Sequence, residues 1–511
     1  MRAACPSALT VCEDSCIMNC TRADIHGQEN CSRMTDEVPL NKLPEVPPSH
    51  TDKVPSAGDD GVSERCSVQK LAINISSEDL NSVPDSVFDV ADDIAELDMA
   101  YNSLVAIPES LCQSLINVTS LSIAGNELQE LPRTISSLSQ LVDLNVSSNK
   151  LASFPSSIVS LSKLCTFNFS VNEIARLPAE FGRLTALDTV VGYENQLQQL
   201  PDTFGLLRRL STLELNDNRM TYLPRNFGFL SSLKILNLSV NKFSSLPDSF
   251  SGLKSLEVLD LTDNLLTSLP SRFRSCRHLR QLFLAKNSLY MLPEWFCDMP
   301  ELEEIVLNGN QLVESPFPEN FGDISVKLKT FEIAGNYVRR LPESLGRLLC
   351  LQSIHIGSLI GELERREWQN GNWIWKLPLN FGSLHALQHA NLNENQICEL
   401  PSDFGCLVML EWLDLGILLL FCFLLSFKLT VSPKMFSLKK ITLSIMNQVR
   451  DVNETRFFVS IPGKEFLDFR ESRLTLPPDN RPAASGIIVI GRSALAISRS
   501  LVASRRLWPA Y

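Results

Sequence analysis

The chain has 511 residues, of which 44% are hydrophobic and 20% charged, and its formal net charge at pH 7 is −12. This length allows a large packed core, and the acidity excludes the broad basic surface that nucleic-acid binding requires. The charge is uneven, because residues 428–511 carry 14 Lys and Arg against 6 Asp and Glu. The negative charge therefore lies mainly in residues 71–427, which favours partner proteins with basic patches.

The first 65 residues are rich in Pro, Ser, Asp and Glu and lack a periodic apolar pattern, so we expect a disordered arm over 1–65. Its cysteine spacings lack the C-x2-C pairs of common zinc sites, so we expect reduced thiols, with lipidation of a thiol as the alternative. The first 20 residues also lack the apolar core of a signal peptide. These features favour a cytoplasmic location, with membrane association left open. The early cysteines are Cys5, Cys12, Cys16, Cys20 and Cys31.

One pattern then repeats from residue 71 to residue 415. It reads L-x-x-L-x-L-x-x-N-x-L-x-x-L-P and is usually followed by x-x-F-G-x-L. Successive asparagines from Asn126 to Asn310 are 23 residues apart at every step. A period of about 20–29 residues with this leucine spacing is typical of leucine-rich repeats, which stack into a solenoid. The key asparagines are Asn102, Asn126, Asn149, Asn172, Asn195, Asn218, Asn241, Asn264, Asn287, Asn310, Asn336 and Asn395.

Each part of the pattern predicts a structure. The L-x-L segment is a short strand whose leucines point inward and whose other residues point outward. The asparagine amide bonds open backbone groups where the chain leaves the strand, and the Leu-Pro step ends regular structure. We predict an α/β leucine-rich repeat solenoid of about 14 repeats over 66–415, with a parallel concave sheet and an irregular or short-helical convex side. Phenylalanines are expected to fill the convex side: Phe181, Phe204, Phe227, Phe250, Phe273, Phe296, Phe321, Phe381 and Phe404.

Three irregularities interrupt the pattern. Gly192 replaces a strand leucine, which predicts a local gap or a softened strand. The spacing from Asn310 to Asn336 is 26 residues, and an insertion at about 360–376 lengthens a later repeat. Loops inserted into repeats are often functional, and Trp is enriched at binding hot spots. We therefore predict an aromatic contact site in this insertion, the alternative being a loop that covers its own repeat. Its tryptophans are Trp368, Trp373 and Trp375.

The segment Leu223-Pro224-Arg225-Asn226-Phe227-Gly228 gives the clearest example of one repeat variant. This variant resembles the intracellular, Ras-group-related leucine-rich repeat proteins, which include Ras-binding scaffolds and the Scribble/Erbin polarity proteins. The resemblance implies a scaffold role in signal transduction. Partners implied by it are a Ras-type small GTPase or a phosphatase. The fold alone does not specify the partner, because many functions share it.

The repeat pattern stops after residue 415. An uncharged run over 415–427 follows, and it is shorter than the roughly 20 apolar residues that span a bilayer. We leave the structure of 416–511, a hydrophobic segment and a basic tail, undecided. The alternative to a cytoplasmic scaffold is a membrane-anchored, receptor-like protein with a span near 415–431.

The sequence holds no P-loop, no G-x-G-x-x-G after a strand, no H-E-x-x-H and no G-x-S-x-G motif. We therefore expect no catalytic residue, no cofactor and no metal site, and we interpret the chain as a non-catalytic protein-binding scaffold. Outward positions of the predicted strands are mostly acidic and indicate a concave binding face, although any solvated sheet carries polar residues. The candidate binding residues are Glu96, Asp98, Asp143, Tyr193, Glu214, Asp217, Asp260, Asp263, Phe283, Glu304 and Glu332.

Overall fold

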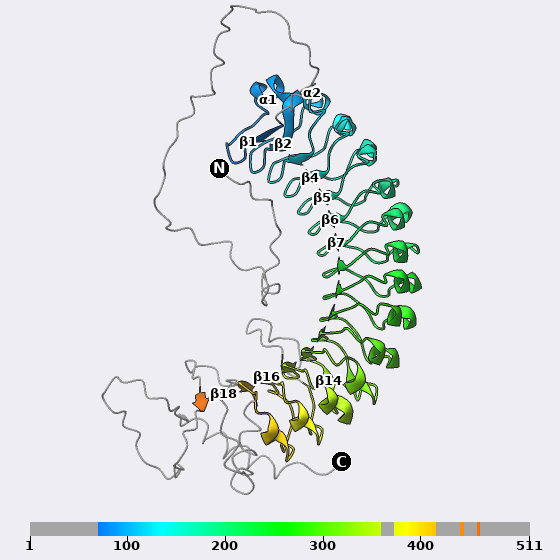
Figure 1. Cartoon of the computed structure of the whole chain (residues 1–511), viewed down its shortest axis with the longest axis vertical. Helices are drawn as coiled ribbons and strands as arrows, with labels where there is room; N and C mark the ends of the chain where they lie inside the picture. Colours follow the sequence, from blue (N-terminus) through cyan, green and yellow to red (C-terminus); the bar gives the residue numbers. More distant parts are fainter. Residues whose placement is uncertain (1–69, 359–371, 415–439, 444–456, 460–511) are drawn as a thin grey trace, which may run out of the picture. The chain divides into compact units, whose positions relative to one another are not determined.

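A computed structural model describes residues 70–358, 372–414, 440–443 and 457–459. The predicted arm over 1–65, the uncharged run over 415–427 and most of the basic tail lie outside these described residues. Within the described part, one long sheet lies on the inner side of a curved array and short helices lie on its outer side (Figure 1). The predicted leucine-rich repeat solenoid with a parallel concave sheet is confirmed.

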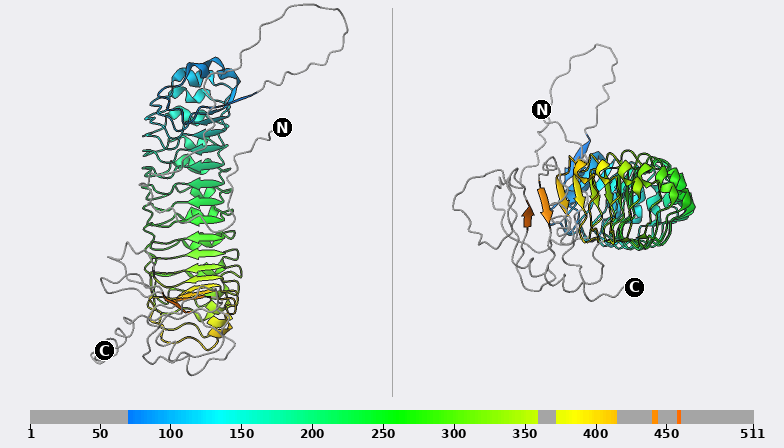
Figure 2. Two further views of the ribbon diagram at one scale, coloured as in Figure 1. Left: turned by 90° about the vertical axis from the view of Figure 1, so that its left-hand side faces the viewer. Right: turned by 90° about the horizontal axis from the view of Figure 1, so that it is seen from below.

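The sheet contains 17 strands among the described residues, and every pair within the array is parallel (Figure 2). The array strands are β1 (Leu71–Asn74), β2 (Ile94–Asp98), β3 (Ser120–Ser122), β4 (Asp143–Asn145), β5 (Thr166–Asn168), β6 (Thr189–Val191), β7 (Thr212–Glu214), β8 (Ile235–Asn237), β9 (Val258–Asp260), β10 (Gln281–Phe283), β11 (Glu304–Val306), β13 (Thr330–Glu332), β15 (Ser353–His355), β16 (His389–Asn391) and β17 (Trp412–Asp414). Beyond them, β18 (Lys440–Leu443) pairs parallel with β17, and β19 (Phe457–Val459) pairs antiparallel with β18.

The strand register follows the repeat spacing. Leu213 of β7 pairs with Leu236 of β8, 23 residues later. The register also holds where the spacing changes, since Glu304 pairs with Thr330 and Ser353 with His389. The extra residues of the two long repeats therefore lie outside the strands, and the sheet passes them without a break.

The convex side consists mainly of short 3₁₀ helices, most of which begin one to three residues after the proline of the repeat. Pro201, for example, is extended and caps the helix that follows it. The helices are α1 (Asp85–Asp89), α2 (Glu109–Ser114), η1 (Ala91–Asp93), η2 (Arg133–Ser137), η3 (Ser156–Ser160), η4 (Phe181–Arg183), η5 (Asp202–Leu206), η6 (Phe227–Phe229), η7 (Asp248–Gly252), η8 (Ser271–Ser275), η9 (Glu294–Asp298), η10 (Phe321–Asp323), η11 (Glu343–Arg347), η12 (Phe381–Ser383) and η13 (Phe404–Cys406). Among the described residues, no helix is both long and apolar enough to cross a membrane.

The core runs through the whole array between the sheet and these helices. The predicted phenylalanines are buried, and from Phe181 to Phe273 their rings stack across successive repeats with centroids 5.6–6.4 Å apart. A single repeat could not bury such a ring, because one face of the ring packs against the preceding repeat and the other face against the following repeat. The stack therefore joins neighbouring repeats along the convex side.

Buried asparagines join the repeats on the other side of the core. The Asn218 side-chain amide donates to the carbonyl oxygens of Gly192 and Leu215, and its oxygen accepts from the backbone N–H of Leu197. The same arrangement recurs in successive repeats, as predicted. One asparagine of this kind, Asn372, was not predicted, because the repeat that contains it is longer than the others. Its buried side-chain amide donates to the carbonyl oxygens of Ile333 and Ile356, and its side-chain oxygen accepts from the backbone N–H of Val338.

The expectation of a gap at Gly192 was wrong. A Cβ placed on Gly192 would lie 2.3 Å from the ring of Phe169, so this phenylalanine already occupies the space of the missing leucine. The adjoining strand β6 pairs in register with β5 and β7. The glycine is therefore the small partner of a large neighbour, and the core is filled at this repeat.

Candidate functional site

Two outward rows of side chains line the concave sheet, one from the first and one from the third residue of most strands. Neighbouring strands are about 4.8 Å apart, so residues in one row are close neighbours. The third-residue row places Phe283 beside Asp260 on one side and Val306 on the other. Glu304 lies in the first-residue row of the strand next to Phe283. We call Glu214, Asp260, Phe283, Glu304 and Glu332 the concave acidic segment; all five are half-buried.

The other predicted binding residues have different surroundings. Glu96 and Asp143 share a row and are exposed, whereas Asp98 and Tyr193 are half-buried. Asp217 and Asp263 do not lie on strands at all. Each occupies the turn before a buried asparagine, with φ values of 52° and 56°. Asp tolerates this left-handed conformation better than most residues, so these two carboxylates have a structural reason to be there.

Two of the predicted acids also bond their own backbone. The Asp98 side chain accepts from the N–H of Ala100, and Asp260 accepts from the N–H of Thr262. Asn145, Asn168 and Asn237 do the same at equivalent positions. Both Asp and Asn supply the oxygen needed for this turn. At these positions an Asx side chain stabilises the turn, and the negative charge at Asp260 is an additional property.

The neighbours Glu303 and Glu304 show how the two surfaces differ. Glu303 lies just before strand β11, where Arg280 and Lys329 approach its carboxylate at 2.7 Å and 2.8 Å. The hydrogen bond from Lys329, together with Arg280, lowers the pKa of Glu303. Glu304 faces the concave side, where burial raises its pKa despite a hydrogen bond from Gln281. Glu303 is neutralised by bases, and Glu304 is not.

Burial also raises the pKa of Glu214 and of Asp260. Among the described residues, no Lys or Arg lies within 4.0 Å of the carboxylates of Glu214, Asp260 or Glu304. These groups have lost part of their hydration without gaining a counter-charge. A cation supplied by a partner would restore that loss, and the adjacent Phe283 ring offers a further favourable contact for it.

A small polar network extends this segment toward the C-terminal end of the array. Asn308 donates to Glu332 at 2.6 Å, and the Nδ1 atom of His355 lies 3.9 Å from the same carboxylate. The other ring nitrogen of His355 is 3.1 Å from the carbonyl oxygen of Ser358. His355 was missing from the predicted site, although its place after Ile354 in the strand pattern marks it as outward-facing.

The three predicted insertion tryptophans separate in the structure. Trp368 lies outside the described residues, which end at Ser358 and resume at Asn372. Trp373 and Trp375 belong to the resumed repeat, where Trp373 is half-buried and Trp375 is exposed on the lateral edge. The positions of these two tryptophans follow from Asn372, whose hydrogen bonds to Val338 and Ile356 align this long repeat with the preceding one.

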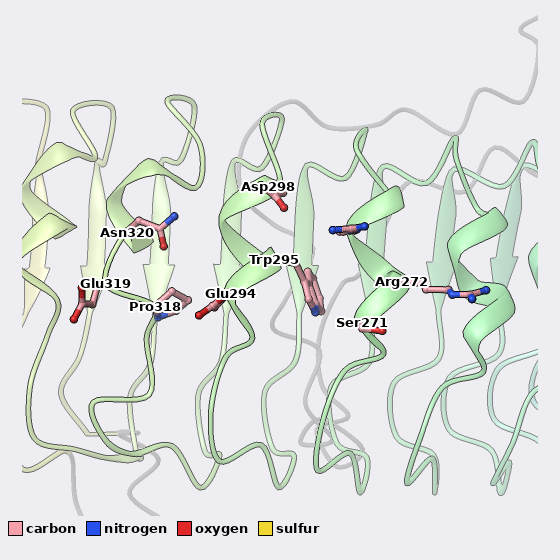
Figure 3. A pocket seen from close by; sticks show the side chains of 9 residues that line it. Ser271, Arg272, Glu294, Trp295, Asp298, Pro318, Glu319 and Asn320 are labelled. Atoms are coloured by element: carbon pink, nitrogen blue, oxygen red, sulfur yellow. The ribbon is translucent and has the colours of Figure 1, made fainter.

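A separate cavity of about 1060 Å³ lies on the convex side, between η8, η9 and residues 318–320 (Figure 3). Trp295 stands near its centre, with Arg272 on η8 and Glu294 on η9 (Figure 3). The Trp295 ring packs 5.5 Å from Phe273 and interrupts the phenylalanine stack. The cavity therefore marks the place where the repeat spacing increases.

No group of three or more His, Cys, Asp or Glu side chains suited to a metal ion occurs in the described part of the chain. The cysteines in that part are free thiols. Burial raises the pKa of Cys112 to about 11 and that of Cys276 to about 12, so both are protonated at neutral pH.

The family model described as "Leucine rich repeat" matches residues 92–151, 208–266 and 257–312. These segments coincide with strands, buried asparagines and convex helices seen in the structure. These segments are leucine-rich repeats, and the described array has the leucine-rich repeat fold. The narrower resemblance to Ras-group-related or Scribble/Erbin proteins is not decided by this match. Among curated proteins, no sequence matches the chain.

Solved structures share the fold. A leucine-rich repeat protein of Leptospira interrogans is 29% identical with a TM-score of 0.59, over 68% of this chain and 90% of that one. A chain of the crystal structure of the Arabidopsis receptor kinase HAESA in complex with the peptide hormone IDA and the co-receptor SERK1 is 26% identical with a TM-score of 0.54. That match covers 65% of this chain and 56% of that one. A chain of the Drosophila Toll–Spätzle complex, 24% identical with a TM-score of 0.55, covers 66% of this chain and 46% of that one and shows the fold alone.

Proposed function

We propose that this leucine-rich repeat protein is a non-catalytic scaffold that binds another protein through its concave face. The observation that carries this proposal is the uncompensated charge of Glu214, Asp260 and Glu304. The half-buried Phe283 lies on the strand between those of Asp260 and Glu304. Partly desolvated carboxylates without a counter-ion weaken the folded protein, and a bound cationic group removes that penalty. The partner therefore presents Lys or Arg side chains to the concave acidic segment.

The chain acts in cytoplasmic signalling, and a small GTPase or a phosphatase with a basic patch is a suitable partner. Support comes from the Leu-Pro-x-x-Phe-Gly repeat variant and from the free thiols of the described part of the chain. The family match supports a protein-binding role, but it does not specify the partner, because many functions share this fold.

The full-length protein used as bait in a cell extract provides the test. Bound proteins are recovered at low and at high salt and identified by mass spectrometry. Exposed charge pairs are screened by salt, so the partners of the concave acidic segment should be recovered mainly at low salt and should carry basic patches. Partners whose recovery does not depend on ionic strength would contradict the proposal.

A second candidate is a membrane-anchored, receptor-like protein, which the likeness to the HAESA receptor kinase favours. In such a protein the array would be extracellular, and the Asn-x-Ser sites at Asn145 and Asn237 would meet the glycosylation machinery. Both side chains instead accept a backbone hydrogen bond on the concave face. Glycans found at these two residues by mass spectrometry of the native protein would favour this candidate over the cytoplasmic one.

A further inference from the structure

A second surface of the array stands apart from the concave face. In each repeat, the residues after the buried asparagine run along one lateral edge. In one stretch of this edge the outward residues are large and apolar: Tyr290 and Met291 are each 52% exposed, and Val313 and Trp375 are each 47% exposed. We call this stretch the edge patch, which consists of Tyr290, Met291, Val313, Tyr337, Arg339, Arg340, Trp373 and Trp375.

The backbone brings these residues into consecutive positions. A separate pair of short parallel strands, β12 (Val313–Glu314) and β14 (Tyr337–Val338), lies on this edge. On one side of the pair, Gln311 donates to the carbonyl oxygen of Leu289, just before Tyr290. On the other side, Trp373 donates to the carbonyl oxygen of Val338. The edge patch is therefore one continuous surface over four successive repeats.

The aromatic rings hold two arginines in place. The Tyr337 and Trp373 rings meet edge to face with centroids 5.7 Å apart. The guanidinium of Arg339 lies 5.2 Å above the Trp373 ring, and that of Arg340 lies 5.9 Å above the Trp375 ring. A stacked guanidinium loses freedom but keeps its N–H edge available, which suits it to bind a carboxylate with two hydrogen bonds.

The charge of the edge patch is opposite to that of the concave face. Residues 311–314, 337–340 and 373–376 contain the bases Arg339, Arg340 and Lys376 and the single acid Glu314. Glu314 forms an ion pair with Arg339 at 3.3 Å. Arg340 and Lys376 form no ion pair within the described part of the chain. A basic and aromatic surface is thus built onto an acidic array.

The fold does not require this composition. The equivalent positions of an earlier repeat are Gln196, Gln198 and Gln199, and that repeat keeps the same strand register and the same buried asparagine. Exposed apolar residues add no stability to the core, and a contiguous group of them is a mark of an interaction site. Trp, Tyr and Arg are also the residues that most often dominate binding energy at interfaces.

We propose that the edge patch is a second docking surface, and that its occupant is an acidic segment of a partner protein anchored by aromatic or aliphatic side chains. The carboxylates of this segment bond Arg340, which forms no ion pair among the described residues, and its apolar anchors pack against Trp375, Tyr290 and Met291. The array then holds two partners of opposite charge, one on the concave face and one on the lateral edge. This inference does not depend on the concave site being correct.

A random peptide library displayed on phage, selected against the full-length protein, tests the proposal. The selection should yield peptides that combine Asp or Glu with an aromatic residue. A synthetic peptide of that sequence is then titrated by fluorescence anisotropy against the wild type and against Trp375→Ala combined with Arg340→Glu. The double variant should bind at least tenfold more weakly. The matched control is Tyr222→Ala combined with Arg219→Glu, which also changes one aromatic residue and one arginine at this edge but outside the edge patch, and which should leave the affinity unchanged.

Two readouts separate the possible outcomes. Circular dichroism melting of both double variants should match the wild type, because the altered side chains are surface residues. Neutralising the concave acidic segment should leave binding of the acidic peptide unchanged. The proposal fails if no acidic aromatic peptide is selected, or if the selected peptide binds the Trp375→Ala and Arg340→Glu protein as tightly as the wild type.

Discussion

At the scale of single residues, the array depends on polar side chains placed where the backbone leaves groups unpaired. The Asn218 amide donates to three carbonyl oxygens at 3.0–3.2 Å and accepts from the N–H of Leu197 at 2.9 Å. These backbone groups are buried and cannot form hydrogen bonds with water instead. One side chain thus satisfies backbone atoms of two neighbouring repeats, which explains why the same residue type returns at this position.

Replacing Asn218 with Ala should lower the free energy of unfolding by about 2–4 kcal/mol, because the buried backbone groups lose their partner. The control is Gln198→Ala in the preceding repeat, whose side chain is exposed and whose loss should have little effect. Urea denaturation followed by circular dichroism measures both. Equal stability of the two variants would mean that water or a shift of the backbone replaces the asparagine.

Glu304 links stability to binding at a single residue. Its pKa is raised in the folded protein because burial disfavours the charged form. For a carboxyl with a raised folded pKa, the contribution to stability is complete below the unfolded pKa and is lost as the pH rises through the folded pKa. Ionised Glu304 therefore costs stability at neutral pH, and the same charge is available to a cationic partner.

Glu304→Gln should raise the melting temperature by about 1–2 °C at pH 7 and leave it unchanged at pH 4, where the native carboxyl is protonated. The same variant should weaken binding of a cationic partner at pH 7. Calorimetric melting at the two pH values and a binding titration provide the measurements. For contrast, Glu303→Gln should lower the melting temperature at pH 7, because Arg280 and Lys329 lose their shared partner. A lower melting temperature for Glu304→Gln at pH 7 would contradict the assignment.

At the scale of elements, the phenylalanine stack shows that the convex helices are held by packing more than by their own hydrogen bonds. Helix η6 has only three residues, Phe227–Phe229, which is too short to be stable alone. Phe227 is fully buried and its ring centroid lies 6.4 Å from that of Phe204 and 6.1 Å from that of Phe250. Phe229, in the same helix, is 57% exposed.

This pair offers a controlled experiment within one helix. Phe227→Ala should cost about 3–5 kcal/mol, because it removes a ring that packs against both neighbouring repeats. Phe229→Ala should cost less than about 1 kcal/mol. Chemical denaturation of the two variants decides the matter, and similar losses for both would show that the stack does not carry the stability assigned to it.

Much of this element structure could be predicted from the sequence, because a fixed period places each strand beside the next and so determines the register. The repeat period gave incomplete or wrong predictions where the repeat length or the residue type departs from the repeat pattern. Asn372 was hidden by residues 359–371, and Gly192 suggested a gap because the neighbour that fills it, Phe169, is contributed by the preceding repeat. Outward-facing strand positions could be read from alternation. The distinction between Glu303 and Glu304 could not, since it depends on bases located in adjacent repeats.

At the scale of the whole molecule, charge is separated between surfaces of one array. Carboxylates on the edges, such as Glu127, Glu257 and Glu301, pair with lysines of neighbouring repeats. Among the described residues, no Lys or Arg pairs with the carboxylates of the concave acidic segment, whereas bases outnumber acids in the edge patch. In a stack of repeats each surface can change independently, because each residue contacts only its own repeat and the adjacent ones. This arrangement suits a scaffold that brings two partners together.

The most direct test of the concave site compares two variants of equal net charge. The first neutralises the concave acidic segment with Glu214→Gln, Asp260→Asn, Glu304→Gln and Glu332→Gln. Asn already occupies the position of Asp260 in other repeats, so the turn is preserved. The second neutralises four paired acids outside the segment with Glu127→Gln, Glu180→Gln, Glu257→Gln and Glu301→Gln.

Affinity for the salt-sensitive partner recovered from the extract is then measured by calorimetric titration of both full-length variants. The concave variant should bind at least tenfold more weakly than the wild type, whereas the variant outside the segment should bind within twofold of it. Equal losses in both variants would show that the partner responds only to the overall charge of the chain, and would contradict a concave binding site.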